Sequence, residues 1–104
     1  MKLLTAADRR ALPALYAQES RGYDAVAYVK FFDPCGAATW YITEFDGDDI
    51  LFGLCDLGFG EPELGYVNLS ELQAVRGPLG LGVERDLYWT PRALRECAVS
   101  GVLR

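Results

Sequence analysis

Three short connectors constrain the fold of this chain more than any other feature of its sequence. Stretches rich in Val, Ile, Tyr, Phe and Trp predict four β-strands, at residues 25–32, 38–45, 50–57 and 63–67. The segments that connect them are only four or five residues long, at 33–36, 46–49 and 58–62. Parallel strands need crossovers of about a dozen residues or more, so we expect an antiparallel meander in chain order.

Both faces of these strands carry apolar residues, so each face needs a cover. Strict alternation along the second strand places Trp40 and Ile42 on one face and Tyr41 and Phe45 on the other. The residues expected to contribute to the core include Trp40, Ile42, Leu54 and Val67.

The N-terminal segment predicts a helix. Thr5 and Asp8 have the spacing of a capping box, with Asp in place of Glu, and apolar residues recur at helical spacing over 6–17. Pro13 lies within that range and has no N–H donor, so the helix either kinks there or begins later. We expect this segment to cover one face of the sheet.

Two short helices are expected in the C-terminal third. Asn68 predicts the cap of a helix that ends near Val75, and Thr90 followed by Pro91 predicts the first residues of another. The fold class is therefore α+β. It comprises a four-stranded antiparallel meander sheet with an N-terminal helix and short C-terminal helices, in one domain spanning 1–104.

The absence of histidine excludes several kinds of site. The 104 residues include no His. This excludes Ser-His-Asp and Cys-His catalysis, zinc sites with His ligands, and the usual proton shuttle near neutral pH. The three cysteines, Cys35, Cys55 and Cys97, have no C-x-x-C spacing and an odd number, which indicates a reducing environment. We expect Cys55 in the core and Cys35 in an exposed turn. No catalytic residue, metal or cofactor is expected.

Composition and the N-terminus indicate a globular protein of the cytoplasm. Residues of the AVILMFWYC set make up 51 % of the chain, and charged residues make up 24 %. The start, Met1-Lys2-Leu3-Leu4, soon reaches Asp8 and leaves no apolar segment for a signal peptide. No window approaches the eighteen apolar residues of a membrane span, so no membrane association is expected.

Charge is distributed unevenly along the chain. The formal net charge is −5, yet residues 31–75 contain nine Asp and Glu and no Lys or Arg, whereas the remainder contains ten basic and six acidic residues. In a meander eight of these acids, all except Glu71, gather at the two ends of the sheet, where they favour a basic partner and repel nucleic acid. The alternative is that they are only solvated turn residues. The candidate partner-binding residues are Asp46, Asp48, Asp49, Asp56, Glu61 and Glu63.

Short motifs carry weaker signals. The Asp-rich stretch 46–49 lacks the spacing of an EF-hand loop and is typical of a hairpin turn rather than a cation site. In the Gly- and Pro-rich segment that follows the second helix, Arg76, Glu84, Arg85 and Asp86 are expected to form a cluster of surface ion pairs.

Glu44 and Asp56 are the obvious carboxylate pair for acid–base chemistry. A turn that pairs Phe45 with Ile50 places Asp56 opposite Thr39, roughly 17 Å from Glu44 at 3.3 Å per strand residue. Carboxyls that far apart cannot share a proton or flank one bond, so the pair does not indicate a hydrolase.

Segments spread over nearly the whole chain together carry a family resemblance. They are Leu3-Leu4-Thr5, Leu12-Pro13-x-Leu15-Tyr16-x-Gln18-Glu19, Tyr28-Val29-Lys30-Phe31-Phe32, Thr39-Trp40-Tyr41, Thr43-Glu44-Phe45-Asp46, Phe52-Gly53-Leu54-x-Asp56, Glu63-Leu64-Gly65-Tyr66, Arg76-Gly77-Pro78-Leu79-Gly80-Leu81 and Glu84-Arg85-Asp86-Leu87-Tyr88. Taken together they resemble the family called domain of unknown function 2958. The resemblance implies a small cytoplasmic bacterial protein of the kind often encoded on plasmids, phages and other mobile elements, and it implies no particular activity.

The function expected is that of a small, acidic, non-catalytic binding protein of a mobile element, comparable to anti-CRISPR or antirestriction inhibitors of host defence. Such a protein occludes the basic nucleic-acid-binding surface of a nuclease or surveillance complex and does not itself bind nucleic acid. The alternative is a small enzyme or accessory factor for plasmid maintenance, with a site near Glu44, Asp46 and the loop from Arg76 to Asp86.

Overall fold

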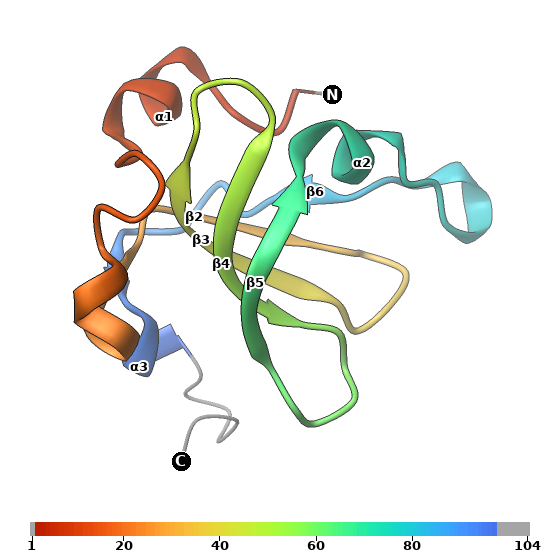
Figure 1. Cartoon of the computed structure of the whole chain (residues 1–104). Coiled ribbons are helices and arrows are strands. Elements are labelled where there is room, and N and C mark those ends of the chain that lie inside the picture. The colour runs from red at the N-terminus through yellow and green to blue at the C-terminus, as the bar shows by residue number, and fades with distance from the viewer. Residues whose placement is uncertain (1, 98–104) are drawn as a thin grey trace.

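The computed structural model describes residues 2–97, in which short segments cover both faces of one antiparallel sheet (Figure 1). The strands of this sheet are β2 (Val29–Phe32), β3 (Thr39–Phe45), β4 (Ile50–Asp56), β5 (Glu63–Asn68) and β6 (Glu84–Arg85). They lie in the order β5-β4-β3-β2-β6, and every neighbouring pair is antiparallel. The expected α+β class and four-stranded meander are confirmed, and β6 extends the sheet beyond β2.

A second, two-stranded sheet pairs β1 (Val26–Ala27) with β7 (Arg92–Ala93). The prediction of one strand over 25–32 is therefore wrong in one respect. The stretch breaks at Tyr28, because the residues before it pair with β7 and those after it pair with β3. A partner that lies more than sixty residues away along the chain leaves no trace in a local pattern.

The remaining elements are short helices. The α-helices are α1 (Ala6–Ala11), α2 (Leu69–Ala74) and α3 (Leu94–Cys97). Two 3₁₀ segments, η1 (Glu19–Asp24) and η2 (Pro78–Gly80), lie before β1 and before β6.

The N-terminal helix has the expected cap but not the expected length. Thr5 Oγ1 accepts the Asp8 N–H at 3.0 Å, and Asp8 Oδ2 accepts the Thr5 N–H at 2.9 Å, which is the reciprocal pair of a capping box. The helix then ends at Ala11, and Leu12 is extended with ψ 125°. Proline disfavours helical backbone in the residue before it, so Pro13 stops the helix, and the prediction of a helix over 6–17 is wrong.

The C-terminal helices are confirmed in part. Helix α2 occupies the expected place after Asn68. Thr90 and Pro91 do not begin a helix, because the next residues form β7 and α3 starts only at Leu94. The Leu94 N–H donates to the Ala25 carbonyl at 2.9 Å, so pairing with β1 sets where this helix begins.

A β-bulge divides β3. The register runs from Thr39 opposite Asp56 to Ile42 opposite Gly53, then shifts so that Glu44 lies opposite Phe52. The expected Thr39–Asp56 pairing is confirmed, whereas Phe45 pairs with Leu51 and not with Ile50. Thr43 is the extra residue. The bulge turns Phe45 onto the same face as Ile42, which corrects the prediction from strict alternation.

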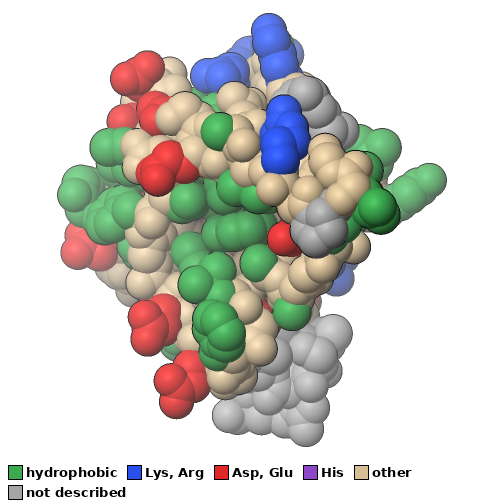
Figure 2. Space-filling model, turned by 90° about the vertical axis from the view of Figure 1, so that its right-hand side faces the viewer, with side chains coloured by type: hydrophobic (Ala, Val, Ile, Leu, Met, Phe, Trp, Pro, Cys, Tyr) green, Lys and Arg blue, Asp and Glu red, His purple; other side chains and the backbone are tan. Residues whose placement is uncertain are grey.

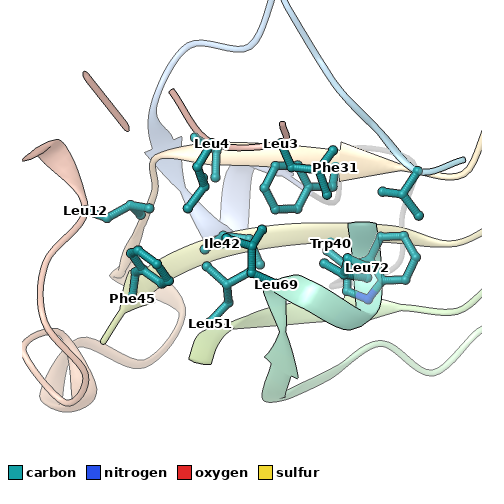
Figure 3. Close-up of a cluster of buried hydrophobic side chains, with 12 residues drawn as sticks. Leu3, Leu4, Leu12, Phe31, Trp40, Ile42, Phe45, Leu51, Leu69 and Leu72 are labelled. Carbon is teal, nitrogen blue, oxygen red and sulfur yellow. The ribbon is translucent and has the colours of Figure 1, made fainter. Parts of the chain in front are cut away.

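The larger hydrophobic core lies on this face of the sheet, which we call the first face (Figure 3). Helix α1 buries none of its own residues; the leucines that flank it pack there instead, together with those of α2. Trp40 and Ile42 are buried as expected, and Val67 is partly buried against the cluster. The buried residues are Leu3, Leu4, Leu12, Val29, Phe31, Trp40, Ile42, Phe45, Leu51, Leu69, Leu72 and Val83.

The opposite, second face is covered by the segments around η1, β1 and α3. Its smaller core consists of Ala25, Ala27, Leu54, Leu94 and Cys97, with Tyr41 and Trp89 packed against it. Leu54 is fully buried, as expected from the sequence. Among residues 2–97, no helix is long and apolar enough to cross a membrane.

Candidate functional site

The turn between β3 and β4 is the first of the two predicted acidic ends. Asp46 closes it: Oδ1 accepts the backbone N–H groups of Asp48, Asp49 and Ile50 at 2.8, 2.9 and 3.0 Å. These hydrogen bonds lower the pKa of the Asp46 carboxyl, and the bond from the Asp48 N–H has the largest effect. The turn is the expected hairpin, with Gly47 at φ 89°. Asp46 is therefore a structural residue of the turn.

Asp49 in the same turn points to α2. Its side chain accepts hydrogen bonds from Asn68 Nδ2 and from the N–H and the hydroxyl of Ser70, at 2.8 to 3.0 Å. These hydrogen bonds lower the pKa of the Asp49 carboxyl, and the bond from the Ser70 hydroxyl has the largest effect. Asp48, by contrast, is exposed and its side chain has no hydrogen bond or ion pair among residues 2–97. At this end Asp48 is the acid available to a partner.

The loop between β4 and β5 is the second acidic end. Asp56 Oδ1 accepts the Gly58 N–H at 2.9 Å and so forms a local turn. Glu61 and Glu63 are exposed, and with Cys55, Leu57 and Phe59 they line a hollow of about 270 Å³. Phe59 is 86 % exposed. Within residues 2–97, this end therefore combines exposed carboxylates with an exposed aromatic ring.

The two acidic ends lie at opposite ends of β4, as the meander predicts (Figure 1). The seven residues of β4 span six intervals, which is about 20 Å at 3.3 Å per residue. Figure 2 shows acidic side chains along one margin of the face that it presents, beside an area of apolar side chains.

The ion pairs among residues 2–97 do not include the acids of 31–75. The pairs formed among residues 2–97 are Lys30–Asp86, Arg85–Asp8 and Arg95–Asp24. Each uses an acid from outside 31–75, so within the described part of the chain no cation compensates any of the nine acids of that segment.

The expected cluster of ion pairs in the loop from Arg76 to Asp86 does not form. Arg76 donates to the carbonyls of Gln73 and Val75, Arg85 pairs with Asp8 and hydrogen-bonds to the Leu3 carbonyl, and Asp86 pairs with Lys30. Arg85 and Asp86 thus bind the end of the loop to the N-terminal segment and to β2. Its hollow, about 400 Å³, shares no residue with the one that Glu44 lines, so the described structure does not join these parts of the alternative site in one pocket.

Glu44 is part of the alternative site expected from the sequence, but it lies in a pocket with residues that the sequence analysis did not group with it. The bulge at Thr43 turns it onto the second face, where it is only 3 % exposed. Oε1 accepts the Tyr16 N–H at 2.8 Å and Oε2 accepts the Gln18 N–H at 2.7 Å. Tyr16 has φ 72°, a conformation that non-glycine residues rarely adopt, so the carboxylate holds a strained segment in place.

Gln18 fixes the same corner from the other side. Its amide nitrogen donates to the carbonyls of Val26 and Thr43, and its oxygen accepts the Val26 N–H at 2.7 Å. This buried amide therefore joins the N-terminal segment to both β1 and the bulge. The sequence signal for the site is a Glu between Thr43 and Phe45 in an apolar strand. Of its two partners, Tyr16 lies in the segment expected to be helical and Gln18 lies just beyond it.

Together these residues line a pocket of about 180 Å³ on the second face. Phe52 and Tyr66 form one wall, with ring centroids 4.9 Å apart, and Tyr16 stands beside them. A hydrogen bond between the side chains of Tyr16 and Tyr66 raises the pKa of Tyr66. The lining residues are Tyr16, Gln18, Glu19, Gly22, Ala25, Thr43, Glu44, Phe52, Leu64, Tyr66 and Leu94.

Among residues 2–97, no group of three or more His, Cys, Asp or Glu side chains is arranged to hold a metal ion. The cysteines are separate: Cys35 is exposed, Cys55 is partly buried against the first core, and Cys97 is buried in the second.

A family model described as a protein of unknown function, DUF2958, matches residues 3–96. The chain belongs to the DUF2958 family. The match includes both acidic ends and the Glu44 pocket, so these features lie within the family domain, whose description assigns no activity. Comparison with curated proteins and with solved structures finds no match.

Proposed function

We propose that this DUF2958 protein is a small, non-catalytic binding protein whose acidic sheet ends engage a basic surface on a protein partner. The partner that a mobile-element setting suggests is a nuclease or surveillance complex of host defence, whose nucleic-acid-binding surface the protein occludes. The observation that carries the proposal is the set of nine acids in 31–75, none of which has a cationic partner among residues 2–97.

Uncompensated charge of one sign creates a field that a complementary surface senses before contact. Asp48 at one end and Glu61 and Glu63 at the other are exposed and make no side-chain hydrogen bond within the described residues. They lie about 20 Å apart along β4, so both ends can touch the same extended basic groove. Phe59 beside the second end supplies the apolar contact on which interfaces commonly depend.

The test begins with affinity capture from the bacterial host and identification of the captured protein by mass spectrometry. The association rate of the purified partner is then measured with Asp48→Lys, Glu61→Lys and Glu63→Lys variants at low and high salt. Asp46 and Asp49 are left unchanged because their carboxylates hold the turn and α2. We expect each variant to associate more slowly, and we expect added salt to slow the parent protein, because charges beyond about 8 Å are screened at physiological ionic strength.

Glu96→Lys is the matched control, because it makes the same change of charge at an exposed position outside 31–75. It should retain the association rate of the parent. Cognate nucleic acid, added first, should reduce binding if both ligands use the same basic residues. Equal rates for all four variants without any dependence on salt would show that the acids are only solvated, and the proposal would be wrong.

A further inference from the structure

We propose that the pocket around Glu44 is a receptor for a single arginine side chain presented by the partner. This inference rests on the proposed binding of a basic protein and identifies the contact that gives it specificity. The pocket differs from the acidic ends in kind, because its carboxylate is buried and rigid rather than exposed.

The Glu44 carboxylate has unused acceptor capacity. An ionised carboxylate offers about four acceptor positions, and the described structure fills two of them, with the N–H groups of Tyr16 and Gln18. Each carboxylate oxygen accepts one of these bonds, so each oxygen has one further acceptor position. A guanidinium group donates two parallel N–H bonds to the two oxygens of one carboxylate, which suits this arrangement.

The charge of Glu44 has no counterion in the described structure. No Lys or Arg is among the residues that line the pocket, and no ion pair among residues 2–97 includes Glu44. Removing a carboxylate from water is costly, and a cation that enters the pocket offsets that cost. Glu19 also lines the pocket, so a cation there would be near two negative charges.

The walls of the pocket suit a flat cation. Phe52 is packed against Tyr66, and Tyr16 and Tyr66 are 61 % and 56 % exposed, so aromatic surface extends from the interior to the rim. Aromatic faces attract cations electrostatically, and a planar guanidinium also stacks on them. The pKa of Tyr66 is raised by its hydrogen bond with Tyr16 and by desolvation, and further by the charges of Glu19 and Glu44, which is consistent with an electronegative pocket.

The size of the pocket favours a side chain over a cofactor. Its volume is about 180 Å³. Pockets for drug-sized ligands and cofactors are larger, about 300–1,000 Å³. An arginine side chain fits this volume, can donate to both open acceptor positions and can stack on the aromatic walls. The compact ammonium of lysine cannot make the two-point contact with the carboxylate.

The probe is N-acetyl-arginine methylamide, titrated into the full chain and followed by NMR chemical shifts. We expect binding with a Kd on the order of 1 mM. The shifts should centre on the amides of Tyr16, Gln18 and Glu44. The neutral isostere N-acetyl-citrulline methylamide and the corresponding lysine derivative should bind at least tenfold more weakly. Equal binding of citrulline or lysine, shifts elsewhere on the protein, or no binding at all would overturn the proposal.

Two variants test the residues. Glu44→Gln should weaken arginine binding at least tenfold, but an amide cannot accept both backbone N–H bonds, so the segment around Tyr16 is also disturbed. Tyr66→Leu therefore serves as the second variant, because Tyr66 is exposed and its removal leaves the carboxylate intact. It should weaken binding several-fold. Tyr88→Leu is the matched control, at a 92 % exposed tyrosine outside the pocket, and should bind like the parent.

The assay contains no protein partner, so its result is separate from the test of the acidic ends. Absence of arginine binding, with slower partner association in the Asp48, Glu61 and Glu63 variants, would overturn the pocket inference alone. Arginine binding that weakens with Tyr66→Leu, together with unchanged association of those variants, would support the pocket and reject the proposed role of the acidic ends.

Discussion

Asp49 caps the helix that contains Ser70, 21 residues further along the chain. Its Oδ1 accepts the Ser70 N–H at 2.8 Å and its Oδ2 accepts the Ser70 hydroxyl at 2.8 Å. The Asp49 carbonyl also accepts the Leu69 N–H at 2.7 Å, while Asn68, the residue before the helix, makes no side-chain cap. The β3–β4 turn therefore holds the first turn of α2 over the end of the sheet.

The first prediction concerns this cap. Asp49→Ala should lower the thermal midpoint, because the N–H and the hydroxyl of Ser70 in the first turn of α2 lose their acceptors. Asp48→Ala, one residue earlier in the same turn, removes a side chain without hydrogen bonds in the described structure and should leave the midpoint nearly unchanged. Circular dichroism during heating measures both variants. Equal midpoints would mean that Asp49 does not stabilise α2.

The second prediction is a loss of stability in acid. Hydrogen bonds that Asp46 and Asp49 accept in the folded chain lower the pKa values of both carboxyls from 3.8. Partial burial alone would raise the pKa of Asp8, but its bonds with Arg85 and Thr5 lower it as well. The folded chain thus binds fewer protons than the unfolded chain, so this stability is complete above about pH 5 and is lost as the pH falls below about 4.

Urea unfolding followed by circular dichroism between pH 3 and pH 7 measures this loss. The midpoint should be level near neutral pH and fall in acid, and the fall should be smaller in Asp49→Ala, which lacks one of the groups. A midpoint that does not change between pH 6 and pH 3 would contradict the assignment of these carboxylates to structural roles.

The third prediction concerns two glycines that face each other across β4 and β5. A Cβ on Gly53 would lie 2.0 Å from the Tyr41 carbonyl oxygen, because the backbones approach closely beside the bulge. Gly53→Ala should therefore destabilise the fold by about 1–3 kcal/mol, the usual cost of overpacking. Gly65 is its partner in the register, and a Cβ there meets no heavy atom within 4 Å. Gly65→Ala is the control and should be tolerated; equal stability of the two variants in urea would refute the close approach.

The fourth prediction is an order of thiol reactivity. Burial raises the pKa of Cys97 to about 11, with smaller contributions from neighbouring charges, and also raises the pKa of Cys55. The thiolate is the reactive form, so both should react slowly at pH 7.5, and the exposed Cys35 should be alkylated first. Peptide mass spectrometry after timed exposure to iodoacetamide gives the order. Labelling of Cys97 as fast as that of Cys35 would show that the second core is open.

Much of the sheet could be predicted because its signals are local. The short connectors require antiparallel neighbours, and Asp46 closes a turn whose partners lie within four residues. The same locality explains the confirmed capping box of Thr5 and Asp8. The predicted helix over 6–17 was wrong for an equally local reason. Pro13 disfavours helical backbone at Leu12, and α1 ends at Ala11.

The sequence by itself determined the meander, the acidic ends and the family, because strand pattern, turn residues and charge are properties of neighbouring residues. The tertiary structure alone decided that Glu44 lines a pocket. Its backbone partners, Tyr16 and Gln18, come from 28 and 26 residues away, and a bulge at Thr43 turns it towards them. These hydrogen bonds depend on how the whole chain packs, because the residues next to Glu44 in the sequence do not indicate which distant N–H groups its carboxylate will accept.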